Sequence, residues 1–137
     1  MPGNWLRLES MNKKTILDAN AVLRYLLADV EEQYLSVKKI IEHNLCTVPL
    51  EVMAEVVYVL EGVYQVPRPE TASSLKELTK DLIITDSDVF LRALDEYALY
   101  PKLDFVDCLM VGYKLSRNAD IVTFDQRLLK RLKNVFL

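Results

Sequence analysis

The pattern of apolar and polar positions alternates between short β-branched runs and longer stretches with helical spacing. Residues 14–18 form a short run that ends in an acid, and residues 20–27 then switch to apolar positions three and four apart. The same change recurs at residues 45–48, which precede a helix that Pro49 opens and that runs to about residue 64. The pattern therefore predicts strands that each feed a helix.

The rest of the chain repeats this scheme. Pro67 and Pro69 interrupt the pattern, and the run from Asp86 to Asp88 is expected to supply a helix N-cap. We expect helices over residues 31–44, 70–81, 89–98, 104–116 and 126–133, and strands over residues 82–85 and 119–122, with a short fifth strand at 135–136.

Strands that alternate with helices favour a parallel sheet covered by helices on both faces and joined by right-handed crossovers. We therefore expect an α/β fold, in which three α/β/α layers enclose a short central parallel sheet of four or five strands. In such sheets ligands bind beyond the carboxyl ends of the strands, so acids at strand ends are candidate functional residues.

Length and composition place the chain among ordinary globular domains. It has 137 residues, of which 51% are hydrophobic and 27% charged, a balance that excludes a disordered tail, a collagen-like repeat or a coiled coil. Residues 12–137 are expected to form one domain. Residues 1–11 carry no periodic pattern, so we expect a tag or loose extension, with Met11 a candidate natural start.

The expected compartment is the cytoplasm. The longest apolar run, Val56 to Leu60, is far shorter than the roughly 18 residues of a membrane-spanning helix, and no signal peptide is recognisable. Cys46 and Cys108 lie in apolar segments, as expected of buried thiols in a reducing compartment. With His43 as the single histidine, zinc sites and histidine-based hydrolase chemistry have little support.

Five acids are candidates for chemistry. Asp18 ends the first expected strand and Asp125 follows the fourth, so parallel strands would bring both carboxylates to one edge of the sheet. Glu55 interrupts a very apolar helix, where a carboxylate is costly unless it is paired, hydrated or metal-bound. Asp104 and Asp107 are three residues apart and share one face at the start of a helix.

Each acid also has a structural interpretation. Asp86 and Asp104 would serve as N-caps, Glu55 would belong with Glu51 to the solvated stripe of an amphipathic helix, and strand-end acids would simply end their strands. Their joint occurrence favours a shared site, because converging carboxylates raise one another's pKa unless a cation lies among them. Mg²⁺ or Mn²⁺ suits such oxygen ligands, and the chemistry implied is phosphodiester hydrolysis.

The acidic motifs resemble a known family. Ile16–Asn20, Ala54–Leu60, Asp104–Asp107 and Thr123–Asp125 are similar, in order, to the four acidic motifs of PIN-domain ribonucleases, and among them to the VapC-type toxins of toxin-antitoxin pairs. The resemblance covers roughly Thr15 to Lys133, and it implies a PIN-like fold.

The resemblance also implies roles for individual residues and partners. The resemblance implies that the protein forms a homodimer. It also implies a small antitoxin as partner, whose tail occupies the acidic cleft. Ala19 stands where the family often has Ser or Thr, and Val106 and Cys108 replace smaller residues, but no carboxylate is lost. The implied catalytic and metal-binding residues are Asp18, Glu55, Asp107 and Asp125, with Asp104 a further candidate ligand and Asn20 and Thr123 as polar supports.

Charge is distributed unevenly along the chain. The net charge is -3, yet residues 111–137 hold more basic than acidic residues, which suits contact with RNA phosphates. The alternatives are solvated helix faces, and for Arg24 a pairing with a carboxylate near the site. The candidate RNA-binding residues are Arg24, Lys114, Arg117, Arg127 and Lys130. Aromatic residues of the early helices are expected in the core or at a subunit interface, namely Tyr25, Tyr34, Tyr58 and Tyr64, together with Leu35.

Three functions remain open from the sequence. The first is a divalent-metal-dependent endoribonuclease that acts as a toxin, and the second is a nuclease of the same fold in RNA processing outside a toxin pair. The third, from a different class, is a magnesium-binding signalling module of the receiver type, against which the helical position of Glu55 argues. A phosphatase with a strand-end Asp-x-Asp pair is disfavoured because Asn20 replaces the second acid. A binding scaffold without catalysis is disfavoured because all four acids are present.

Overall fold

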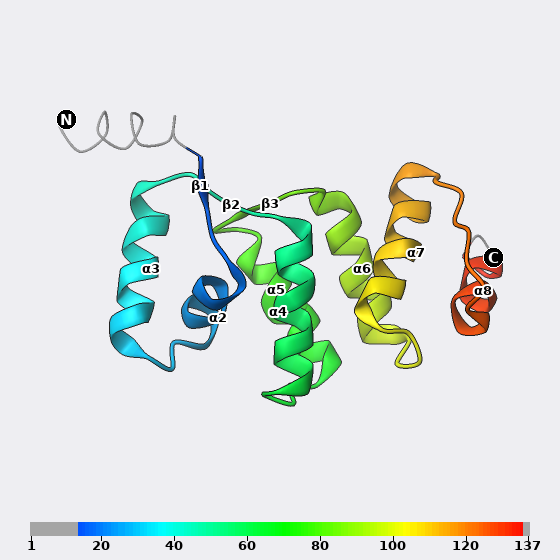
Figure 1. The fold of residues 1–137 in the computed structure, drawn as a ribbon, viewed down its shortest axis with the longest axis horizontal. Helices are drawn as coiled ribbons and strands as arrows, with labels where there is room; N and C mark the ends of the chain where they lie inside the picture. The colour runs from blue at the N-terminus through cyan, green and yellow to red at the C-terminus, as the bar shows by residue number, and fades with distance from the viewer. Residues whose placement is uncertain (1–13, 136–137) are drawn as a thin grey trace. The chain divides into compact units, whose positions relative to one another are not determined.

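The computed structural model describes residues 14–135 (Figure 1). The chain divides into two compact units. Among the described residues, the first unit holds residues 14–56 together with Glu77–Thr85, and the second holds Val57–Lys76 and residues 86–135. The elements in chain order are β1 (Thr15–Ile16), α2 (Ala19–Leu27), α3 (Glu31–His43), β2 (Cys46–Val48), α4 (Leu50–Gly62), α5 (Arg68–Leu78), β3 (Ile83–Ile84), α6 (Ser87–Leu99), α7 (Phe105–Arg117) and α8 (Gln126–Lys133).

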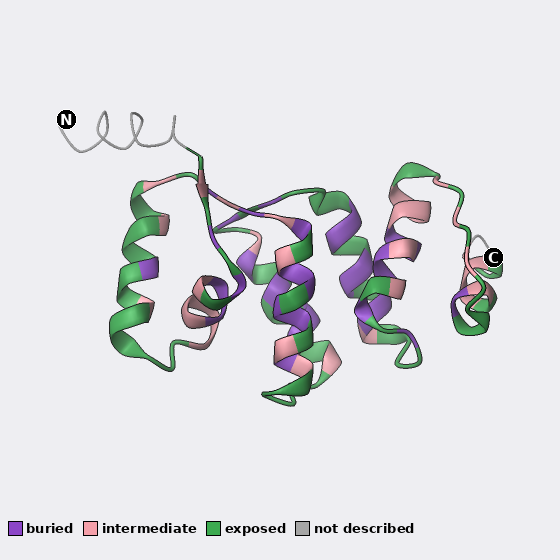
Figure 2. Ribbon diagram, viewed as in Figure 1, coloured by how far each residue is buried: buried purple, intermediate pink, exposed green. Residues whose placement is uncertain are grey.

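The first unit is built on a parallel sheet of three strands in the order β1-β2-β3. Thr15 pairs with Cys46, and Thr47 pairs with Ile83. The ladder continues past the end of β1, where the Leu17 N–H donates to the Thr47 carbonyl at 3.1 Å. Helices α2 and α3 pack against each other, and α3 is exposed over most of its surface (Figure 2).

The second unit is helical, and its centre is the packing of α6 against α7. Phe105 of α7 meets Phe90 and Tyr97 of α6 edge to face, with ring centroids 6.0 and 5.6 Å apart. A Cβ at Gly112 would lie 2.7 Å from the Val89 carbonyl oxygen, so this glycine permits the close approach of the two helices. Figure 2 shows buried positions along both of these helices.

The α/β class predicted from the sequence is confirmed, and most helix bounds agree within one or two residues. The helix expected over 70–81 spans Arg68–Leu78 instead. It begins earlier than expected because Pro69 is tolerated in the first turn, where its missing N–H has no helical partner. No helix among residues 14–135 is long and apolar enough to cross a membrane.

The expected sheet of four or five strands is wrong in its count, because the described residues form three. Residues 119–125 connect α7 to α8 without regular structure, so the strand expected at 119–122 is absent. A strand requires a neighbour for its backbone groups, and the described part of the second unit contains none. Val122 and Phe124 are 90% and 93% exposed there.

Some predictions fall on the chain ends. The fifth strand at 135–136 includes Phe136, and the extension over residues 1–11 includes Met11; these residues lie outside the described range. The prediction of one domain over residues 12–137 stays a prediction.

Candidate functional site

Asp18 lies between β1 and α2, at the position where the sequence expected an acid at a strand end. Its Oδ1 accepts a hydrogen bond from the Ala21 N–H at 2.8 Å, so the carboxylate is the N-cap of α2. Asp18 and Asn20 are both exposed, and with Arg24 they line a hollow of about 410 Å³ in the first unit. Arg24 is paired with Asp29 at 3.0 Å.

Glu55 lies on the exposed side of α4, in line with Glu51 and Tyr58. A carboxylate in this apolar helix was expected to be paired, hydrated or metal-bound, and exposure of Glu55 to water meets the second of these conditions. Among the described residues, no hydrogen bond or ion pair involves the Glu55 carboxylate. The carboxylate is thus held only by the helix.

Asp104 and Asp107 form a reciprocal capping box at the start of α7. The Asp107 N–H donates to Oδ1 of Asp104 at 2.8 Å, and the Asp104 N–H donates to Oδ2 of Asp107 at 3.3 Å. Burial raises the pKa of Asp107, and the negative charges of Asp104 and then Asp125 raise it further. Three of the predicted acids therefore act on one another within the second unit.

Asp125 is the N-cap of α8. Its Oδ1 accepts hydrogen bonds from the Arg127 and Leu128 N–H groups at 2.9 and 3.1 Å. Its own N–H donates to Oγ1 of Thr123 at 3.1 Å, so Thr123 fixes the turn that presents the acid. The cap uses only one carboxylate oxygen, and no hydrogen bond or ion pair among residues 14–135 involves Oδ2 of either Asp125 or Asp18.

Tyr58 is a neighbour of the acids that the sequence interpretation missed, since it was expected in the core or at a subunit interface. The residue is 41% exposed. Burial of its phenol and the charge of Asp104 raise the pKa of Tyr58, while a hydrogen bond from the Val106 backbone opposes this shift. The available signal was its position three residues after Glu55 in the polar stripe of α4.

Arg68 was also missed, and it holds the segment that leads into Asp104. Its guanidinium lies over the Tyr97 ring at 4.2 Å, and its Nη1 donates to the Leu103 carbonyl at 2.6 Å. Its Nε donates to Glu61 at 3.2 Å. These contacts join α4, α5, α6 and the start of α7, and no local sequence signal announces them.

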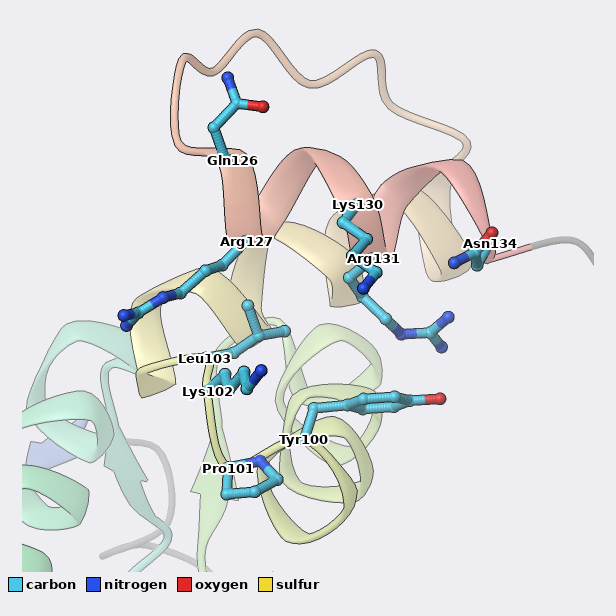
Figure 3. A pocket seen from close by; sticks show the side chains of 9 residues that line it. All are labelled: Tyr100, Pro101, Lys102, Leu103, Gln126, Arg127, Lys130, Arg131 and Asn134. Carbon is cyan, nitrogen blue, oxygen red and sulfur yellow. The ribbon is translucent and has the colours of Figure 1, made fainter.

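The predicted RNA-binding cations have different surroundings. Arg117 is paired with Asp86 at 2.8 Å and with Asp88 at 2.9 Å, and Lys114 is half-buried on α7. Arg127 and Lys130 are exposed on α8 and line a hollow in the second unit (Figure 3).

The acids suit a hard divalent cation, although neither unit by itself holds a complete set of ligands. Within either unit, no three His, Cys, Asp or Glu side chains among the described residues are arranged to hold a metal ion. The donors at the start of α7 are carboxylate oxygens, the ligands that Mg²⁺ and Mn²⁺ prefer. A cation there would relieve the repulsion that raises the pKa of Asp107.

Comparison with known proteins gives one finding at the level of the family. The family model described as PIN domain matches residues 15–134. A search of the curated proteins found no match, and a search of the solved structures found none either.

Proposed function

The chain belongs to the PIN-domain family, and from this premise we propose that it is a divalent-metal-dependent endoribonuclease. PIN domains are generally nucleases, which favours this function over a receiver-type signalling module. The proposed reaction is hydrolysis of phosphodiester bonds in single-stranded or looped RNA, with Mg²⁺ or Mn²⁺ as cofactor.

The observation that carries the proposal is the gathering of acids at the start of α7. Asp104 and Asp107 interlock through the capping box, and the charge of Asp125 reaches Asp107. No cationic side chain among residues 14–135 forms an ion pair with these three carboxylates. A folded chain that keeps such repulsion uncompensated is poised for an external cation.

We propose that Asp18, Glu55, Asp107 and Asp125 hold the ion, with Asp104 as an additional ligand. The N-cap bonds of Asp18 and Asp125 fix each carboxylate through Oδ1, and Oδ2 is then the oxygen offered to the metal. When bound, the ion supplies an activated water and stabilises negative charge on the phosphate oxygens.

The residues of the chain orient this reaction. The water releases a proton to solvent as its oxygen bonds to phosphorus, the bond from phosphorus to the leaving ester oxygen breaks, and that oxygen takes up a proton from solvent to leave as a hydroxyl group. Thr123 keeps Asp125 in position and Arg68 keeps Asp104 in position through the Leu103 carbonyl, while the support from Asn20 is proposed on the resemblance alone. No covalent intermediate with the protein is required.

We further propose that the nuclease is the toxin of a VapBC-type pair, acts in the cytoplasm and forms a homodimer. A small antitoxin would neutralise it by placing a segment in the acidic cleft. The support is the resemblance of the four acidic motifs to VapC-type toxins. The alternative is a nuclease of RNA processing. Growth of cells that express the protein distinguishes the two functions, because an active toxin arrests growth and a processing enzyme does not.

The test is RNA cleavage by the purified wild type and by Asp18→Asn, with Mg²⁺, Mn²⁺ or EDTA. Asn is as good an N-cap as Asp, so this variant keeps α2 and loses only the charge. We expect metal-dependent cleavage by the wild type and none by the variant. The exposed Asp120→Asn is the matched control and should cleave normally. Cleavage by Asp18→Asn, or by the wild type in EDTA, would overturn the mechanism.

A further inference from the structure

A hollow of about 860 Å³ lies in the second unit between α8 and the segment Tyr100–Leu103 (Figure 3). The floor contributed by Tyr100, Pro101 and Leu103 is largely apolar, while α8 contributes basic side chains on the other side. This size is within the range of pockets that bind small organic ligands. The hollow is large enough for a nucleotide unit.

The cations of the hollow fall into two kinds. Arg131 is committed to the fold, because it donates to both carboxylate oxygens of Glu96 at 2.7 Å and lies over the Tyr100 ring at 4.3 Å. Lys102, Arg127 and Lys130 also line the hollow, and none of the three forms an ion pair with any residue from 14 to 135. No acid lines the hollow, so these three positive charges face it uncompensated.

The hollow adjoins the acids of the proposed active site along the chain on both sides. Leu103 directly precedes Asp104, and Gln126 directly follows Asp125. The hollow therefore lies within one residue of two of the acids along the chain. Contacts between cationic side chains and the phosphates of a nucleic acid set its register on the protein without reading its bases.

We propose that this hollow, formed by Lys102, Arg127 and Lys130 over the Tyr100–Leu103 segment, binds the RNA substrate through backbone phosphates next to the scissile bond. The inference rests on the proposed nuclease function and adds where the substrate is held. A nucleotide matches the site better than an acidic protein segment does. The phosphate of a nucleotide contacts the three cations, and its flat base covers the apolar floor. A carboxylate side chain of an acidic protein segment is too small to cover this floor.

The experiment measures binding separately from cleavage. A fluorescently labelled single-stranded RNA is titrated with the full chain in EDTA, where no cleavage takes place, and affinity is followed by anisotropy at several salt concentrations. Lys130→Ala is expected to weaken binding about threefold and to lower the slope of log affinity against log salt by about 0.7, the value for one phosphate contact in a single strand. The triple variant Lys102→Ala, Arg127→Ala, Lys130→Ala is expected to lose at least about tenfold.

Lys133→Ala is the matched control. Lys133 is exposed on the same helix and carries the same charge, but it does not line the hollow, so its removal should leave affinity and salt slope unchanged. Equal effects of Lys130→Ala and Lys133→Ala would overturn the proposal. So would poly-glutamate that binds more tightly than RNA and depends on Lys130, because the hollow would then be a surface for an acidic protein. RNA binding in EDTA without cleavage in Mg²⁺ would keep the phosphate site and reject the nuclease.

Discussion

Helices α6 and α7 begin with similar acidic patterns but treat their charges in opposite ways. Asp104 has extended backbone and caps α7 with its side chain. Asp86 occupies the same position before α6, but its backbone is left-handed, with φ at 52°, and its carboxylate makes no cap bond. Arg117, at the far end of α7, instead binds Asp86 and Asp88 together. Asp86 therefore occupies the expected N-cap position of α6, but its side chain makes no capping hydrogen bond.

The electrostatic result differs between the two helix starts. Hydrogen bonds from Arg117 lower the pKa of Asp88, whereas burial and the neighbouring carboxylates raise the pKa of Asp107. Arg117 compensates the negative charge at the start of α6. No cationic side chain among residues 14–135 forms an ion pair with the acids at the start of α7. Acidic motifs thus indicate a cation site only where the fold supplies no cation of its own.

The largest expected effect is on catalysis. Asp107→Asn should lower RNA cleavage about 1,000-fold, the upper range for loss of one preorganised electrostatic group, because a proposed metal ligand loses its charge. Asp88→Asn, at the start of α6, should leave cleavage unchanged. Single-turnover assays of the two variants test the comparison, and similar losses for both would remove it.

Replacement of an arginine that pairs with an acid should lower the free energy of unfolding most where the ion pair is buried. The side chains of Glu96 and Arg131 are 7% and 15% exposed. Arg131→Met leaves the Glu96 carboxylate buried without its partner, and we expect the free energy of unfolding to fall by about 3 kcal/mol. Arg117→Met breaks an exposed pair and should cost much less. Urea denaturation compares them, and equal losses would show that burial does not decide the value of these pairs.

Metal binding should distinguish the acids that raise the pKa of Asp107, which include Asp125, from the acids at the start of α6 by their effect on stability. At a free Mg²⁺ concentration 100-fold above its dissociation constant, the wild type should gain about 2.7 kcal/mol, seen as a higher melting temperature. Asp125→Asn keeps the N-cap of α8 but should lose most of this gain, while Asp88→Asn should retain it. A gain that is the same in Asp125→Asn would place the ion elsewhere.

The smallest effect concerns pH in EDTA. The pKa of Asp107 is raised on folding, so its stabilising contribution is complete below the ordinary value of 3.8 and is lost as pH rises through the folded pKa. The pKa of Asp88 is lowered, so its contribution is present above 3.8 and is lost as pH falls through the folded pKa. At neutral pH, Asp107→Asn should therefore be more stable than the wild type and Asp88→Asn less stable.

Both differences should shrink as the solution is acidified toward pH 3. Thermal melts across this range give the two signs directly. If the two variants shift stability in the same direction at neutral pH, then the opposite pKa shifts of Asp88 and Asp107 do not describe the protein.

The sequence by itself determined the helices, the α/β class and the acids worth attention. Helix bounds such as 126–133 were predictable because apolar spacing and N-caps act between residues three or four apart. The roles of Asp104 as a cap and Pro49 as the opening of a helix are local for the same reason. The order of the four acidic motifs is likewise a property of the chain alone.

Only the tertiary structure decided which charges are compensated and which strands form. Arg117 reaches Asp86 from 31 residues away, and Arg131 reaches Glu96 from 35, separations at which no sequence pattern acts. The 119–122 segment has strand-like residues but no backbone neighbour in its unit, so it stays irregular. Hydrogen-bond ladders and ion pairs join distant segments, and their partners are fixed only when the chain has packed.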